Sequence, residues 1–406
     1  MDADLAAGLP PADDALLAEL SVGVDFITDF WLEQYLDRYI FLGGSKIKFI
    51  VGDAGSGKSH CLRLFLAGAA QRHYKTALLS AKTVWIHDFK ELYAAILPAA
   101  DLPGSLAAYA DTVIREMGYA PEDFTPGETF ADYLSRSGQF TPLARREIRA
   151  QIENFFLKNP RIDNNFALAC TILTGGILGY PILEAQNRSL LLDWLAGAKG
   201  VRVAPLRKLG LSPSRITKYN ARHMLRSLVE VLRLTGTPGL VVGIDDLDVL
   251  AGASRLESLH YTKLRREDAY ESIRELIDDI DTMSHLMMVF SFDRRLLDDE
   301  RAGLKSYQAL WMRIQNEIDS DCFNRFADII DMDRLAKFVY TPETLAEISR
   351  RLALHAEAAG LASHPIDAAT AAALKVSDSI EAYALPRKIN RLTLGKEQRA
   401  EGESNG

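Results

Sequence analysis

Cysteine is scarce in this chain of 406 residues, and its three cysteines, Cys61, Cys170 and Cys322, stand far apart. This number and spacing exclude a disulfide framework and a cysteine-based metal cluster, and they fit a reducing cytoplasm. Residues 1–7 are acidic and lack the basic start that is typical of a signal peptide. We therefore expect a cytoplasmic protein.

Long apolar runs are also missing. Residues 166–183 carry no charge, but they include three glycines and a proline and reach only the lower length limit of a membrane span. A pair of buried helices is the better interpretation of this run. No association with a membrane is expected.

An overall excess of positive charge is absent as well. The net charge of −8 argues against a wholly basic, nucleic-acid-coating protein, but it leaves room for a local basic patch. Hydrophobic residues make up 48% of the chain, which is enough for a substantial core. The length predicts about two or three domains.

Residues 52–59, Gly-Asp-Ala-Gly-Ser-Gly-Lys-Ser, fit the phosphate-binding pattern G-x-x-x-x-G-K-[ST] at every fixed position. A short apolar strand is predicted just before them at 47–51, and a helix just after them at 60–70. In that context the glycines let backbone N–H groups surround phosphate oxygens at a helix N-terminus. The predicted nucleotide-binding residues are Gly52, Asp53, Ala54, Gly55, Ser56, Gly57, Lys58, Ser59 and His60, with Lys58 on the β- and γ-phosphates and Ser59 on Mg²⁺.

A second apolar strand, residues 240–244, ends in the two carboxylates of Asp245 and Asp246. At a strand end beside the glycine loop, Asp245 is expected to hold Mg²⁺, through a water molecule. Asp246 is then expected to orient or deprotonate the water that attacks the nucleotide. The alternative is an ordinary acidic turn.

Further candidate residues follow the next strands. Ser291, with Asp293 just beyond it, is placed to contact the γ-phosphate or the attacking water, although a simple turn cap is an equal alternative. Arg325 directly precedes the last strand and is a candidate to complete a neighbouring subunit's site, or else a surface ion pair; Arg313 is the second choice. Arg387 opens a C-terminal helix and is expected to fold back onto the phosphates, unless it is only a solvated basic helix end.

The fold class expected from these elements is α/β: a P-loop NTPase with a parallel sheet, a large helical insertion and a C-terminal helical lid. Residues 1–45 are expected to form an N-terminal arm and a leading helix. Residues 46–335 form the ATPase domain, with the insertion at about 88–234. Residues 336–395 form the lid, and the polar residues 396–406 are expected to be disordered. Strands are predicted at 47–51, 76–80, 239–246, 286–292 and 327–331.

These elements in this order resemble the AAA+ ATPases, and residues 245–250, Asp-Asp-Leu-Asp-Val-Leu, are similar to the paired-acid stretch of the origin-recognition/Cdc6-like branch. A narrower resemblance covers most of the chain. Residues 52–60, 192–197, 220–226 and 239–246, together with Pro386-Arg387, are similar to the ATP-binding proteins of BREX-type phage-defence loci. This resemblance implies ATP and Mg²⁺ as cofactors and the other subunits of a defence complex as partners.

One residue departs from that family, which has Asp-Glu where this chain has Asp245-Asp246. Aspartate is one carbon shorter than glutamate, so its carboxylate lies roughly 1.5 Å further back. A misplacement of about 1 Å can cost about 100-fold in rate. Slow hydrolysis is therefore an open alternative, and Asp248 is a weaker candidate to substitute.

Residues 194–229 contain no acid but eight cations: Lys199, Arg202, Arg207, Lys208, Arg215, Lys218, Arg222 and Arg226. One interpretation is a contact with the phosphate backbone of DNA or RNA. The other is a solvated surface that pairs with acids elsewhere, such as 246–248 or 267–268. Within this stretch, Ser212 is predicted to cap a helix that begins at Pro213.

The leading prediction is an ATP-binding, ATP-hydrolysing AAA+-type switch or motor in a multiprotein phage-defence system, with DNA contact through residues 199–226 and a homo-oligomer as further possibilities. The first alternative is an ATP-binding switch or scaffold that hydrolyses negligibly because of Asp246. The second, less favoured alternative is a P-loop kinase for a small molecule.

Overall fold

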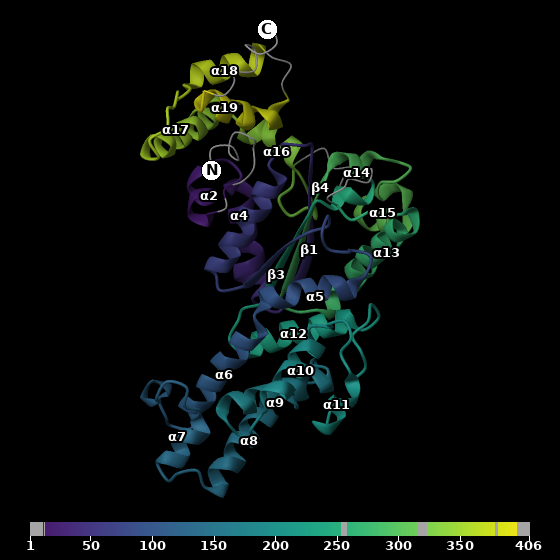
Figure 1. Ribbon diagram of the computed structural model, residues 1–406. Helices are drawn as coiled ribbons and strands as arrows, with labels where there is room; N and C mark the ends of the chain where they lie inside the picture. Colours follow the sequence, from purple (N-terminus) through teal and green to yellow (C-terminus); the bar gives the residue numbers. More distant parts are fainter. Residues whose placement is uncertain (1–10, 12, 253–257, 316–322, 378–380, 396–406) are drawn as a thin grey trace, which may run out of the picture.

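The computed structural model describes residues 11, 13–252, 258–315, 323–377 and 381–395. Its centre is a sheet of five parallel strands in the order β2-β3-β4-β1-β5 (Figure 1). The strands are β1 (Ser45–Gly52), β2 (Lys75–Ser80), β3 (Leu240–Asp245), β4 (Leu286–Asp293) and β5 (Ile329–Asp331). The predicted α/β class with a parallel sheet is confirmed.

The inner strands β1, β3 and β4 are almost wholly buried, because both faces of the sheet are covered by helices. On one face, Val241, Met287 and Val289 pack against α3 (Asp25–Trp31) and α4 (Lys58–Gln71). On the other, Val242, Met288 and Phe290 join the larger core. Helices α5 (Phe89–Ala100) and α13 (Lys263–Asp279) contribute to that larger core.

The N-terminal part is more ordered than the expected arm. Residues 14–20 form helix α2 (Asp14–Leu20), whose Leu16 and Leu17 are buried and which packs on α4 and on the lid. The leading helix expected within residues 1–45 is α3 continued by a π-helical segment η1 (Leu32–Ile40). Most of the arm, residues 1–10, lies outside the described residues.

Between β2 and β3 the chain forms a helical block, which we define as residues 88–234. It comprises α5, α6 (Leu102–Glu116), η2 (Pro121–Asp123), α7 (Phe130–Arg136), α8 (Pro142–Phe156), α9 (Asn164–Leu178), α10 (Ala185–Leu195), α11 (Val203–Lys208) and α12 (Ala221–Leu234). The uncharged run 166–183 is a single buried helix followed by a turn at a cis Tyr180–Pro181 bond, rather than a helix pair. No helix begins at Pro213; residues 211–217 are irregular, and α12 starts at Ala221.

After β3 come η3 (Leu247–Leu250), α13, η4 (Ile280–Thr282) and β4, then α14 (Arg294–Asp298), η5 (Leu304–Ser306) and α15 (Gln308–Ile314). Residues 316–322, which include Cys322, and the tail 396–406 lie outside the described residues. Cys61 and Cys170 are buried and unbridged.

The lid consists of α16 (Met332–Val339), α17 (Pro342–Ala358), α18 (Ala368–Ser377), η7 (Ala382–Ala384) and α19 (Leu385–Thr393). It has a small apolar cluster of its own, centred on Leu345, Leu385 and Ile389. Figure 1 shows the lid at one end of the molecule and the helical block at the other, with the sheet between them. In the described part of the chain, no helix is both long and apolar enough to cross a bilayer.

Candidate nucleotide-binding site

The glycine loop, residues 52–59, joins the end of β1 to the start of α4. Gly55 and Gly57 have φ angles of 93° and 88°, which are left-handed conformations that glycine adopts without strain. A Cβ on Gly52 would lie only 2.5 Å from Ser56 Oγ, so this position also needs glycine. The loop therefore curls tightly in front of a helix N-terminus, where the first N–H groups have no partner within the helix.

Lys58 lies across the inside of this loop. Its Nζ donates hydrogen bonds of 2.8 Å to the carbonyl oxygens of Gly52 and Asp53. Burial lowers the pKa of Lys58, and the charges of Asp293 and Asp248, among other carboxylates, oppose that shift. The ammonium group is thus positioned inside the loop and surrounded by negative charge.

Ser56 is a further polar group in the loop. Its side chain is buried, and Oγ has no hydrogen-bond partner among the described residues. A buried hydroxyl without a partner is costly unless a ligand or a water molecule completes its bonding. The orphaned hydroxyl therefore fits a loop that receives an anionic ligand.

The two acids that end β3 point to opposite sides of that strand. Asp245 accepts a hydrogen bond from Ser291 Oγ on β4, which lies between β3 and β1. Asp246 instead accepts one from Ser80 Oγ of β2 at 2.7 Å and forms an ion pair with Lys82. The structure thus brings Asp245 and Ser291 together on the glycine-loop side, while Asp246 is held on the β2 side.

Asp246 has φ 61° and ψ 29°, a left-handed conformation. Among residues with a side chain, aspartate and asparagine adopt this conformation most readily, because their short polar side chains can bond locally. Its own N–H donates to Asp245 Oδ1 at 2.8 Å. This backbone geometry gives a physical reason for aspartate where glutamate was expected.

A lid-side carboxylate that the sequence analysis missed lies against the glycine loop. The N–H of Asp53 donates to both oxygens of Asp333, each at 3.0 Å. Arg294 bridges Asp333 and Asp331, at 2.8 and 2.5 Å. Burial raises the pKa of Asp333, against the lowering effect of these hydrogen bonds. The sequence signal was an arginine directly after β4, Arg294, together with one aspartate that ends β5 and another two residues later.

The lid closes over the glycine loop and forms a pocket with it. This pocket is lined by Gly55, Ser56 and Gly57 of the loop and by Tyr383, Arg387 and Asn390 of the lid. A Cβ on Gly55 would lie 4.0 Å from Arg387 Nη1, so the guanidinium lies near the loop, and its contact with the phosphates stays a prediction. Val22 also lines the pocket, and Asn390 Oδ1 is buried without a partner among the described residues.

A family model described as the BREX system ATP-binding protein BrxC/D matches residues 3–376. The chain belongs to this family. The resemblance found in the sequence is thereby confirmed, and with it ATP binding within a multisubunit phage-defence system. No curated protein and no solved structure matches the chain.

In this BrxC/BrxD-family protein, His60 also lines the pocket. Burial lowers its pKa to about 4, so the ring is neutral at pH 7. The hydroxyl of Ser21 donates to the carbonyl of Leu17 at 2.6 Å, and it therefore accepts from His60 Nε2, also at 2.6 Å. This assignment places the proton on Nε2 and leaves Nδ1 as an acceptor.

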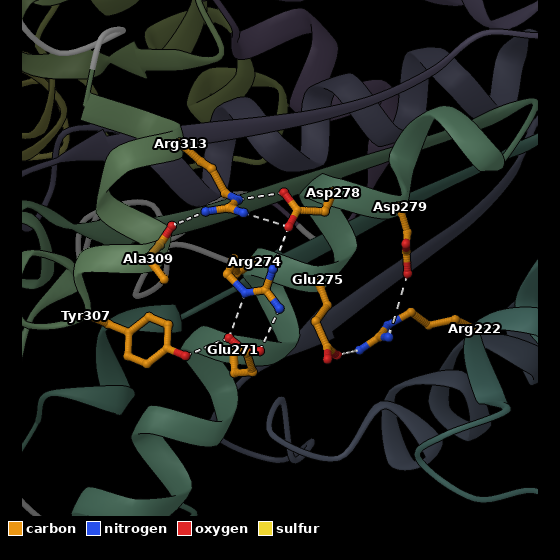
Figure 2. A network of polar contacts seen from close by, with 9 residues as sticks. All are labelled: Arg222, Glu271, Arg274, Glu275, Asp278, Asp279, Tyr307, Ala309 and Arg313. Atoms are coloured by element: carbon orange, nitrogen blue, oxygen red, sulfur yellow. Dashed lines mark hydrogen bonds and ion pairs between the residues drawn. The ribbon is translucent and has the colours of Figure 1, made fainter.

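The two arginines considered for a contact in trans lie away from the glycine loop of this BREX protein. Arg325 stacks on the rings of Phe26 and Phe30 of α3, at 4.6 and 4.4 Å from the ring centres. Arg313 forms a two-bond ion pair with Asp278 of α13 and donates to the carbonyl of Ala309, as Figure 2 shows. Neither contact brings these arginines to the chain's own glycine loop, so a role for Arg325 in a neighbouring subunit stays a prediction.

The residues predicted to hold Mg²⁺ offer one hydroxyl, Ser59, and one carboxylate, Asp245. The described part of the chain contains no group of three or more His, Cys, Asp or Glu side chains that could hold a metal ion. Mg²⁺ is commonly held by one or two protein oxygens together with the phosphates of a nucleotide and water. The donor set therefore fits Mg²⁺ that arrives with a nucleotide, rather than a permanent metal centre.

Proposed function

We propose that this BREX protein is an AAA+-type ATPase that binds Mg-ATP between the sheet and the lid, hydrolyses it, and acts as a nucleotide-driven switch or motor in its cytoplasmic defence complex. One observation carries the proposal: a single pocket is lined by Gly55 and Gly57 of the glycine loop and by Arg387 of the lid. A ligand held there contacts both parts, so its binding favours the closed arrangement.

The phosphates lie against the glycine loop. Lys58 exchanges its two carbonyl acceptors for phosphate oxygens, which are stronger acceptors because they are charged. Ser56 Oγ gains the partner it lacks. Bound Mg²⁺ neutralises phosphate charge when Ser59 and Asp245 help to hold it.

The base lies in the apolar part of the pocket, which is lined by Val22, Ile348 and Leu352. Two residues that carry a hydrogen-bond acceptor also line the pocket, Asn390 with Oδ1 and neutral His60 with Nδ1. Adenine presents an amino group at its ring edge where guanine presents a carbonyl, so acceptors at this edge favour ATP over GTP.

Hydrolysis requires a carboxylate near the attacking water, and Asp246 is our candidate. Its bonds to Ser80 and Lys82 hold it away from the phosphates. We infer that the described conformation is restrained and that Asp246 must leave these partners before water is activated. The same contacts favour the second candidate function, a switch that binds ATP but turns it over negligibly.

An Arg387→Ala variant tests the proposed contact between lid and nucleotide. We expect Mg-ATP affinity to fall by about tenfold to 100-fold, since one charge-assisted hydrogen bond is worth about 1.5–3 kcal/mol. Isothermal titration with ATP and with GTP measures the affinity, and the wild type is expected to prefer ATP.

The matched control is Arg350→Ala, because Arg350 is also on the lid but pairs only with Glu347 at the surface. Unchanged ATP binding in Arg387→Ala would mean that the lid does not contact the nucleotide. Equal binding of ATP and GTP by the wild type would contradict the proposed base contacts.

A further inference from the structure

Six of the eight cations in the basic stretch have no acid beside them. Lys199, Arg202, Arg207, Lys208, Arg215 and Lys218 are exposed, and none of the six is in an ion pair with any described residue. Arg222, by contrast, lies between Glu275 and Asp279 (Figure 2). Two of the acids considered as partners pair with other cations, Asp246 with Lys82 and Glu267 with Lys263. Neutralisation by distant acids therefore explains only a small part of this surface.

Three cations from different parts of the helical block meet at one pocket. Lys90 of α5, Lys199 beyond α10 and Arg215 of the loop before α12 line a cavity of about 240 Å³. Its other lining residues include Trp194 and several small residues, and no carboxylate. Like charges around one cavity repel each other unless an anion lies between them. Phosphate is an anion that Lys and Arg bind well.

The walls of this pocket are held firmly. Trp194 Nε1 donates to the carbonyl of Ser214 at 3.0 Å. Asn220 accepts from the N–H of Thr217 at 2.7 Å and donates to the carbonyl of Arg215 at 3.2 Å. On the opposite wall, a Cβ on Gly197 would lie 3.4 Å from Cε of Lys90. The three cations are thus presented by an ordered frame rather than by a loose loop.

An exposed aromatic ring lies in the turn at residues 218–220, between the pocket residue Arg215 and helix α12. Tyr219 is 85% exposed, and Lys218 Nζ lies 5.3 Å from its ring centre. Asn220 ties this turn to Arg215, so the ring and the pocket belong to one surface. A ring beside cations is the arrangement on which unpaired bases stack while their phosphates are neutralised.

We propose that this surface binds single-stranded nucleic acid, with one backbone phosphate in the pocket formed by Lys90, Lys199 and Arg215 and a base stacked on Tyr219. The other exposed cations, Arg202, Arg207 and Lys208, extend the contact along the strand. The site lies in the helical block, at the opposite end of the molecule from the lid (Figure 1). It uses no residue of the nucleotide pocket, so it stands independently of the proposed ATPase function.

Fluorescence anisotropy with a labelled 20-nucleotide single strand tests this proposal on the full chain. The wild type is expected to bind it more tightly than a duplex of equal length, with an affinity that falls as salt rises. The double variant Lys199→Glu/Arg215→Glu should lose at least tenfold in affinity. The slope of log affinity against log salt should become shallower by about 0.7, for one lost phosphate contact.

Two further variants distinguish binding at this site from a non-specific attraction by positive charge. Arg301→Glu/Lys305→Glu makes the same change in net charge at exposed positions outside the helical block and should bind nearly as the wild type does. Tyr219→Ala should weaken single-strand binding about tenfold without changing the salt slope.

Equal losses in the two double variants, or no binding by the wild type, would overturn the proposal. So would displacement of the strand by polyglutamate at the same concentration of charge, which would indicate a docking surface for an acidic protein. If duplex binds as tightly as the single strand and Tyr219→Ala changes nothing, the stacking site is wrong.

Discussion

A Lys58→Ala variant is expected to lose Mg-ATP binding by at least 100-fold. Lys58 is the only cation whose side chain bonds within the described glycine loop, where its Nζ contacts Gly52 O and Asp53 O at 2.8 Å. Two charge-assisted hydrogen bonds to phosphate are worth about 3 kcal/mol or more, which corresponds to more than about 100-fold in affinity. Isothermal titration of Mg-ATP into the full chain measures the loss.

Lys46→Ala is the matched control, because Lys46 is also on β1 but pairs with Asp328 away from the loop. It should bind ATP as the wild type does. Thermal unfolding of both variants without nucleotide checks that the fold is intact. Tight Mg-ATP binding by a folded Lys58→Ala variant would show that the site is assigned to the wrong residues.

An Asp246→Asn variant is expected to lower the rate of ATP turnover by about 100-fold to 10,000-fold, the range typical of removing a general base. Asparagine has the same shape and accepts the left-handed backbone of this position, so the fold should persist. Affinity for Mg-ATP should stay within about twofold, because the binding contacts come from the glycine loop and the lid. Steady-state phosphate release measures the rate.

The turnover rate of an Asp248→Asn variant is compared with that of Asp246→Asn. Asp248 Oδ1 accepts a hydrogen bond from the N–H of Asp293 at 3.3 Å, and its charge acts on Lys58. We expect a smaller loss of rate in this variant than in Asp246→Asn. A larger loss would transfer the role of base to Asp248.

The Asp246→Glu variant separates hydrolysis from a non-hydrolysing switch. A large gain in turnover over a nearly inactive wild type favours the switch, whereas brisk turnover by the wild type removes that alternative. Glutamate in the left-handed conformation costs about 1–2 kcal/mol. A modest fall in thermal stability is therefore expected in either case.

The strands and the glycine loop could be predicted because their signals are local. The largely apolar runs 47–51 and 286–292 are typical of strands in a covered parallel sheet, and the glycine pattern at 52–59 has few other structural uses. Arg387 was named from the basic start of a C-terminal helix, and its contact with the phosphates stays a prediction.

The orientation of the side chains at the strand ends could not be predicted from the sequence. Asp245 and Asp246 are neighbours, but the left-handed backbone at Asp246 turns the second carboxylate toward β2, and no sequence pattern encodes that turn. The contact between Asp333 and the N–H of Asp53 joins residues 280 positions apart. Arg325 stacks on Phe26 and Phe30 because a helix from the N-terminal region covers it, and that neighbour was not predictable from its own surroundings.

Hydrogen–deuterium exchange with and without a non-hydrolysable ATP analogue and Mg²⁺ tests most directly whether ATP joins the sheet to the lid. The account predicts protection of amides in two segments together, the glycine loop at 52–60 and the lid helix α19 (Leu385–Thr393), because the nucleotide contacts both. The Lys58→Ala variant should lose protection in both segments. Protection of the glycine loop with unchanged exchange in α19 would contradict the account.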